Sequence, residues 1–299
     1  MPTLASLLDA PAGARTVVSG VGKDAGKTSL VGLALPVVRA GGPAGVFSVG
    51  LDGERRGRHA ARIDLAPGDV SVTTQALARA STARFEILEA LPGRSAMGRL
   101  LLVRAIRGGS VAVVGPDTLS ALEGAIRTAE DAAGVRRVLI DSPAGRLTQV
   151  AALSADFLAV ARVDPGTLAA TASRLAALEA LADLPPAGPA DHSGGPHVDL
   201  DGPLTPAVLD ALPSTLASLT LADLTACFLA PAALARLLRR VEVSVRRRLD
   251  LRGIVVSLRD VTRESFAAAL GRPPGQRYLF DPWLLPSPAG GPAGTAVAR

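Results

Sequence analysis

A glycine-rich loop near the start of the chain carries the residues best suited to bind phosphate. It has the sequence Gly20-Val-Gly-Lys-Asp-Ala-Gly-Lys-Thr28, followed by Ser29. Backbone N–H groups of such a loop, together with the N-terminus of a following helix, bind oxyanions. Lys27 would contact the β and γ phosphates of a nucleotide, and the Thr28 hydroxyl would be a ligand of Mg²⁺. The other candidate binding residues of the loop are Gly20, Gly22, Lys23, Asp24, Ala25, Gly26 and Ser29.

The distribution of lysine supports this interpretation. Lys23 and Lys27 are the only two lysines of the chain, although it has 32 basic residues. Arginine is a poor substitute where a compact ammonium group must reach between phosphates. We therefore take Lys27 and Lys23 as candidate catalytic residues. The alternative is a glycine turn without a ligand.

The elements around the loop predict a mainly parallel sheet. Arg15 to Ser19 is a β-branched run that predicts a strand before the loop, and Ser29 to Arg39 predicts a helix after it. Further strands and helices alternate along the chain, and parallel strands joined by helical crossovers form sheets covered on both faces. The sequence therefore predicts an α/β fold. The main further elements expected are strands at Val46 to Val49, Arg137 to Asp141 and Phe157 to Val163, and helices at Thr118 to Ala133 and Thr167 to Leu184.

Composition divides the chain into four parts. We expect a nucleotide-binding domain over residues 1–184 and a linker rich in proline and glycine over 185–203. Residues 204–285 would form a smaller C-terminal α/β unit or further strands of the same sheet. Residues 286–299 would be a flexible tail.

The loop resembles that of a superfamily of P-loop NTPases, which includes dethiobiotin synthetase, the septum-site and plasmid-partition ATPases and cobyric-acid-type amide ligases. The usual loop has four residues between the first glycine and the Gly-Lys pair, whereas this chain has one more. Dethiobiotin synthetase has the same longer spacing. Partition ATPases carry a signature lysine five residues before the loop lysine, where this chain has Gly22, with Lys23 beside it. A second stretch, Val138-Leu-Ile-Asp-Ser-Pro-Ala-Gly145, is similar to the strand and turn of the septum-site ATPases.

This resemblance implies roles for three further residues. Asp141 would hold Mg²⁺ through water, and Gly145 would lie in the turn that senses the γ-phosphate. Asp52 stands where partition ATPases have the aspartate that orients the attacking water, and it is both a catalytic and a metal candidate. Glu54 is an alternative in the same loop, and a surface turn is the alternative interpretation of Asp52-Gly53.

The resemblance implies ATP and Mg²⁺ as cofactors. The guanine motif Asn-Lys-x-Asp is missing after Phe157 to Val163, where Arg162-Val-Asp-Pro165 stands instead, so ATP is preferred over GTP. A slow ATP hydrolase acting as a nucleotide-dependent switch or accessory protein is the first hypothesis. The alternatives are a ligase or kinase acting on a small carboxylate and a scaffold without catalysis. Expected partners are the nucleotide, a small acidic substrate or partner enzyme, and a second copy of the chain.

Composition argues against several other classes. Only 3% of residues are aromatic and the net charge is +5 without long blocks of one sign, so no nucleic-acid partner is expected. The most apolar stretch, Leu216 to Leu238, contains Asp223 and Pro231, which argues against a membrane span. The N-terminus has no secretory pattern, and Cys227 is the single cysteine. These features predict a cytoplasmic protein.

Three weaker candidates remain. Arg55, Arg56 and Arg58 could bind an acidic substrate but fit a solvated surface loop better. A metal site could include His192 and His197 with neighbouring aspartates, although a proline-rich segment would not fix its geometry. The arginines from Arg236 to Arg252 could form a basic face, but Val241 to Val245 alternates as a half-exposed strand does.

Overall fold

The computed structural model describes residues 2–9, 11, 13–22, 24–49, 62–95, 97–142, 153, 156–188 and 195–284. Within these residues, nine strands form one sheet in the order β14-β13-β9-β1-β8-β2-β4-β6-β5. Neighbouring strands from β14 to β4 are parallel, whereas β6 is antiparallel to both β4 and β5. The prediction of a mainly parallel sheet is therefore confirmed. The strands are β1 (Arg15–Gly20), β2 (Ala44–Ser48), β4 (Val70–Thr74), β5 (Arg84–Ser95), β6 (Gly98–Arg107), β8 (Arg137–Ser142), β9 (Asp156–Val163), β13 (Leu251–Leu258) and β14 (Tyr278–Phe280).

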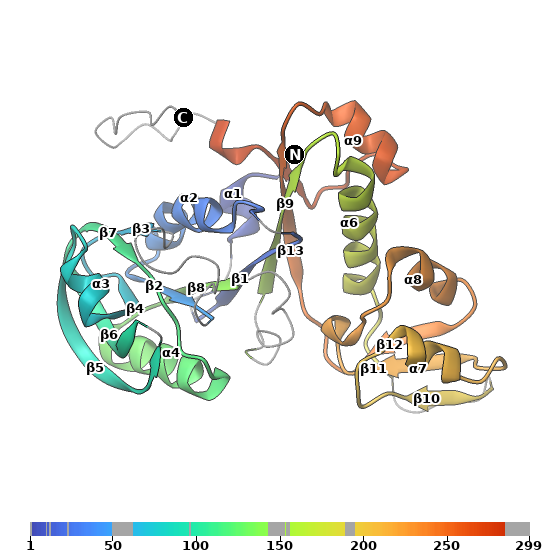
Figure 1. Cartoon of the computed structure of the whole chain (residues 1–299), viewed down its shortest axis with the longest axis horizontal. Coiled ribbons are helices and arrows are strands. Elements are labelled where there is room, and N and C mark those ends of the chain that lie inside the picture. Colours follow the sequence, from blue (N-terminus) through green and yellow to red (C-terminus); the bar gives the residue numbers. More distant parts are fainter. Residues whose placement is uncertain are drawn as a thin grey trace.

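Helices cover both faces of this sheet, as Figure 1 shows with α2 above β1, β8 and β2 and with α4 below them. On one face, Leu30 and Val31 of α2 (Lys27–Arg39) pack with Val18 and Val160 of the sheet. The short helix α1 (Leu4–Leu7) joins this layer. On the other face lie α4 (Leu119–Ala133), α6 (Leu168–Ala182) and α9 (Arg263–Leu270). β1 therefore packs into a hydrophobic core on each face of the sheet, and α2 packs into the core of the first face.

The β4-β6-β5 end of the sheet carries a smaller layer. It consists of the antiparallel pair β3 (Arg62–Leu65) and β7 (Gly109–Ala112) and the short helix α3 (Gln75–Arg79). Two apolar runs, at 100–106 and 110–114, flank Gly108 and Gly109. They are successive strands in different sheets, because Gly108 and Gly109 let the chain pass close to Leu65 and Thr82.

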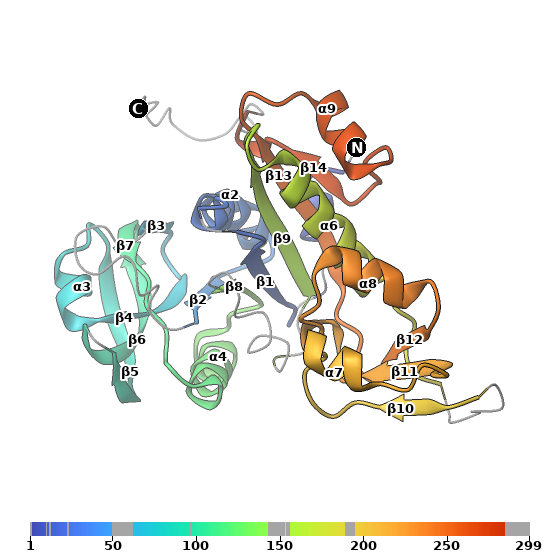
Figure 2. The same ribbon diagram turned by 45° about the vertical axis from the view of Figure 1, so that its right-hand side comes forward.

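A second, three-stranded parallel sheet lies beside α6 in Figure 2. It consists of β10 (His197–Asp199), β11 (Ser218–Leu221) and β12 (Glu242–Val245), with α7 (Pro206–Ala211), α8 (Pro231–Leu238) and the 3-10 turn η1 (Leu224–Ala226). The chain then returns to the main sheet as β13 and β14, and the turn η2 (Pro282–Leu284) follows. Three residues of the segment expected to be a linker, His197 to Asp199, form β10 by pairing with β11.

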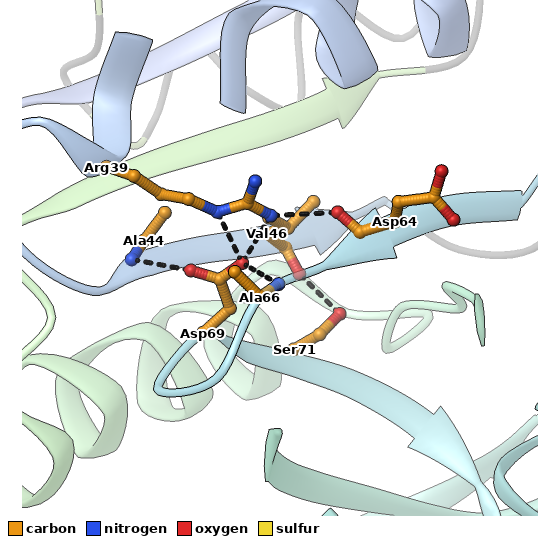
Figure 3. A network of polar contacts seen from close by, with 7 residues as sticks. All are labelled: Arg39, Ala44, Val46, Asp64, Ala66, Asp69 and Ser71. Carbon is orange, nitrogen blue, oxygen red and sulfur yellow. Dashed lines mark hydrogen bonds and ion pairs between the residues drawn. The ribbon is translucent and has the colours of Figure 1, made fainter. Parts of the chain in front are cut away.

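A buried aspartate ties the C-terminal end of α2 to the sheet (Figure 3). The Asp69 side chain is 1% exposed, and Arg39 of α2 donates to it from Nε at 2.8 Å and from Nη2 at 2.5 Å. The backbone N–H groups of Ala66 and Ala44 donate to the same carboxylate at 2.8 and 3.2 Å. Arg39 also donates to the carbonyl of Asp64 at 2.8 Å. All these donors converge on one side chain, so Asp69 holds together α2, β2 and the turn before β4.

A second buried carboxylate joins α6 to the C-terminal strands. Glu179 of α6 is 6% exposed and accepts a hydrogen bond of 2.5 Å from the Tyr278 hydroxyl of β14, and it also pairs with Arg272. Burial raises the pKa of Tyr278 above its usual value of 10.0, and the hydrogen bond to Glu179 raises it further. The phenol therefore stays protonated in the folded protein at pH values where the unfolded chain ionises.

This raised pKa predicts a loss of stability in alkali. Above about pH 10 the unfolded chain releases the Tyr278 proton and the folded chain keeps it, so stability falls by about 1.4 kcal/mol per pH unit. Below pH 10 the hydroxyl is protonated in both states and contributes no slope. Because Tyr278 is the single tyrosine, tyrosinate absorbance reports its ionisation directly. Absorbance that rises only with unfolding is expected. In Tyr278→Phe the Tyr278 contribution to this slope disappears, and an unchanged slope would contradict the assignment.

Candidate phosphate-binding site

The loop lies where the connections of the main sheet change direction. β1 has β8 on one side and β9 on the other, and all three run parallel. After β1 the chain crosses through α2 to β2 on the β8 side, whereas β9, β13 and β14 extend the other side. In parallel α/β sheets, ligands bind beyond the carboxyl ends of the strands at such a switch point. The loop from 20 to 28 is at this edge.

The loop favours glycine at two positions, Gly20 by close packing and Gly26 by its backbone conformation. The Val21 N–H donates to the carbonyl of Val160 in β9 at 2.8 Å, so the chain leaves β1 toward β9. A Cβ on Gly20 would lie 3.1 Å from the Gly22 carbonyl oxygen and 3.1 Å from Cδ of Lys27. Gly26 has a φ of +92°, which side chains rarely adopt. The loop therefore folds back over the end of β1, and the Lys27 stem lies against Gly20.

The N-terminus of α2 offers backbone donors to an anion. Gly26 is its N-cap, and a glycine has no side chain that could accept from the first N–H groups of the helix. Its carbonyl accepts the first helical bond from Leu30 at 2.9 Å. Lys27, Thr28 and Ser29 form the first turn, so their N–H groups and the helix dipole point toward the loop.

Thr28 and Asp141 lie together, although 113 positions separate them in the sequence. The Thr28 hydroxyl donates to Oδ2 of Asp141 at 3.3 Å. Asp141 is in register with Val18 of β1, near the carboxyl end of β8. A hydroxyl and a carboxylate at the start of α2 are oxygen ligands of the kind that Mg²⁺ prefers. Their contact is observed, and their role as metal ligands remains a prediction.

The described loop residues Gly20, Gly22, Asp24, Ala25 and Ser29 share this edge with Lys27 and Thr28. Asp24 has a φ of +53°, and Ala25 is buried against Val18 and Leu30. The remaining predicted site residues lie outside the described residues. They are Lys23, Asp52 and Gly145. The weaker candidates Glu54, Arg55, Arg56 and Arg58 also lie outside the described residues.

Arg162 is a neighbour of the loop that the sequence alone does not indicate. It lies near the carboxyl end of β9, and its guanidinium binds Asp164 at 3.1 to 3.4 Å. The hydrogen bond to Asp164 raises the pKa of Arg162, and the charge of Asp24 in the loop adds to this effect. The sequence places Arg162 near the end of a predicted strand, but only the pairing of β9 with β1 brings it near the loop.

The weaker candidates take part in other contacts. His197 contacts Asp199 at 3.4 Å and Ser218 at 2.8 Å, and Arg246 pairs with Asp199 and Asp201. No cluster of three or more metal-ligating side chains occurs in the part of the chain that the structure describes. The arginines at 247, 248 and 252 each pair with an aspartate. Cys227 packs against the core, and burial raises its pKa.

These features define an α/β protein with a mainly parallel sheet and a glycine loop at the start of a helix. No protein-family model matches the chain, and no curated protein does. Among solved structures, the MinC:MinD cell division protein complex of Aquifex aeolicus is similar, with a TM-score of 0.37 and 11% identity. The match covers 87% of this chain and 78% of that one. Similarity of this degree assigns no function. Among the described residues, no helix is long and apolar enough to cross a membrane.

Proposed function

We propose that the chain is a P-loop NTPase that binds Mg-ATP and acts as a slow nucleotide-dependent switch or accessory protein. The observation that carries this proposal is the 3.3 Å hydrogen bond from the Thr28 hydroxyl to Asp141 at the start of α2. In P-loop NTPases a threonine or serine at this point of the loop and an aspartate at the end of a neighbouring strand hold Mg²⁺.

The residues of the loop fit a triphosphate. The first-turn N–H groups of α2 and the Lys27 ammonium supply positive charge, and Gly20 allows the close approach of Lys27 to the loop backbone. Thr28 and Asp141 would hold Mg²⁺, which neutralises charge on the phosphates when it is bound. Arg162, whose pKa is raised mainly by Asp164 and further by the charge of Asp24, would keep a further positive charge near this edge. The chain thus positions and neutralises an anion at this edge.

Turnover is expected to be slow. Phosphoryl transfer depends mainly on positioning and on charge stabilisation, and P-loop GTPases hydrolyse at about 10⁻⁴ s⁻¹ without an arginine finger and about 10⁻² s⁻¹ with one in cis. Asp52 would orient the attacking water and Gly145 would sense the γ-phosphate. The difference between the ATP and ADP states would then be sensed by a partner, or by a second copy of the chain.

Thermal unfolding in the presence of nucleotide tests the proposal. Mg-ATP at a hundred times its Kd should stabilise the folded chain by about 2.7 kcal/mol, and Mg-GTP should stabilise it less. Lys27→Ala should abolish this gain because the ammonium between the phosphates is lost. Lys27→Arg is the matched control for charge, and it should recover little of the gain.

Two results would contradict the proposal. One is the absence of a shift with either nucleotide, and the other is an equal shift in Lys27→Ala. Circular dichroism of the variant without nucleotide separates a loss of binding from a loss of folding.

A further inference from the structure

The helical layer stops short at the β5 end of the main sheet. α4 contacts β5 and β6 on one face, but α3 has only five residues and covers little of the other face. A hollow of about 630 Å³ lies there, between α3 and the β5–β6 hairpin, and we call it the α3 groove. Sheet faces in α/β proteins are normally covered by another layer. The groove is a place where that cover is incomplete.

Apolar side chains line the α3 groove and remain in contact with solvent. Ile87 is 60% exposed and Ile106 is 61% exposed, and both lie on the groove. Ile87 is opposite the buried Val103 in the pairing of β5 with β6. Phe85, partly buried, extends the apolar surface. Exposed apolar side chains gathered at a hollow mark an interaction surface more often than scattered ones do.

The charge of the α3 groove is of one sign. Arg79, Arg84 and Arg107 line it, and no acidic residue is among the described residues of its wall. Arg107 donates to the carbonyl of Thr82 at 3.3 Å, which holds its guanidinium at the rim. Two copies of this groove facing each other would bring six guanidinium groups together, at a cost from like-charge repulsion. An occupant with acidic side chains fits better.

The longer segments of this sequence outside the described residues do not match that charge, and residues 189–194 carry a single acid, Asp191, in six residues that include a proline and a glycine. Residues 285–299 and 143–152 contain no acidic residue, and residues 50–61 contain Asp52 and Glu54 against three arginines. An added strand is also disfavoured, because the pairing of β5 with β6 has three irregularities that disturb the edge. A helix laid on the sheet face beside α3 meets neither obstacle. We propose that the α3 groove binds an amphipathic helix of a partner protein, with apolar side chains against Ile87 and Ile106 and acidic ones toward the arginines.

A designed peptide tests this proposal with the full chain. The probe is a fluorescein-labelled helix of about 18 residues, with Leu at helical i, i+3, i+4 and i+7 positions and Glu elsewhere on its polar face. A second peptide has Lys in place of Glu. Fluorescence anisotropy should show the Glu peptide binding at least about tenfold more tightly than the Lys peptide, with the difference shrinking at high salt.

Variants of the groove decide the outcome. The double change Ile87→Ser and Ile106→Ser should weaken the Glu peptide about tenfold, whereas Phe228→Ser, at an exposed apolar site elsewhere, should leave it unchanged. The double change Arg79→Glu and Arg84→Glu should reverse the preference in favour of the Lys peptide, a result that misfolding cannot produce. The proposal is overturned if the Glu peptide does not bind, or if neither set of variants alters its affinity.

Discussion

Replacing Asp69 with Asn is expected to lower the free energy of unfolding by about 3–5 kcal/mol, the usual cost of breaking a buried ion pair from one side. Asn has nearly the same shape, so packing is retained. Its amide nitrogen would face N–H donors, however, because the carboxylate accepts from Arg39, Ala44 and Ala66 through both oxygens. At least one buried donor then loses its acceptor, and Arg39 loses the charge it pairs with.

Urea unfolding at 25 °C measures this change. The control is Glu86→Gln, which removes an exposed pair with Arg104 at 3.2 Å. That pair should contribute less than about 1 kcal/mol, because both side chains are in contact with solvent. Equal losses in the two variants would show that burial of the Asp69 network does not determine its contribution.

The position of Asp69 connects stability to the candidate site. Arg39 is the last residue of α2, whereas Lys27 and Thr28 are its first. Asp69 therefore anchors the far end of the helix whose N-terminus carries the candidate phosphate-binding loop. If Asp69→Asn weakens nucleotide binding as well as stability, α2 moves as a rigid element; if only stability falls, the loop is held by β1 and its neighbouring strands without a contribution from the far end of α2.

The elements around the loop could be predicted because their sequence signals are local. The run Arg15 to Ser19 is observed as β1 with one added residue, and Ser29 to Arg39 is observed as α2 starting at Lys27. Thr118 caps α4 with its side chain, so the helix begins where the sequence indicates. The positive φ of Gly26 favours glycine there, and a Cβ on Gly20 would be crowded by the loop and by Lys27.

The arrangement of the strands could not be predicted because it depends on distant partners. Nothing local in Gly253 to Leu258 shows that β13 pairs with β9 rather than with β12, the strand before it. The same holds for Arg162, whose place beside the loop follows from that order. The Asp69 network joins residues 25 to 30 positions apart. The stretch Pro67-Gly68-Asp69 has the sequence of an ordinary turn, so nothing in it indicates that Asp69 is buried.

Thr28→Ala is expected to weaken Mg-ATP binding about tenfold to a hundredfold, the range for a lost contact to a charged group. ATP binding measured in EDTA should be unchanged, because Lys27 and the backbone N–H groups remain. Thr28→Ser retains the hydroxyl and should bind Mg-ATP almost as the original chain does. Titration calorimetry with and without Mg²⁺ measures these affinities, and Thr128→Ala, which removes an exposed hydroxyl that donates to Glu89, is the control.

Asp141→Asn extends this prediction to the pair of residues. If Thr28 and Asp141 act through one metal ion, the loss in the double variant will be smaller than the sum of the two single losses, because the second change removes a contact that no longer exists. If they only hydrogen-bond to each other, the variants will affect folding stability and leave the Mg²⁺ dependence of ATP binding intact. The double-mutant cycle, measured once for stability and once for Mg-ATP affinity, therefore separates a metal site from a structural hydrogen bond.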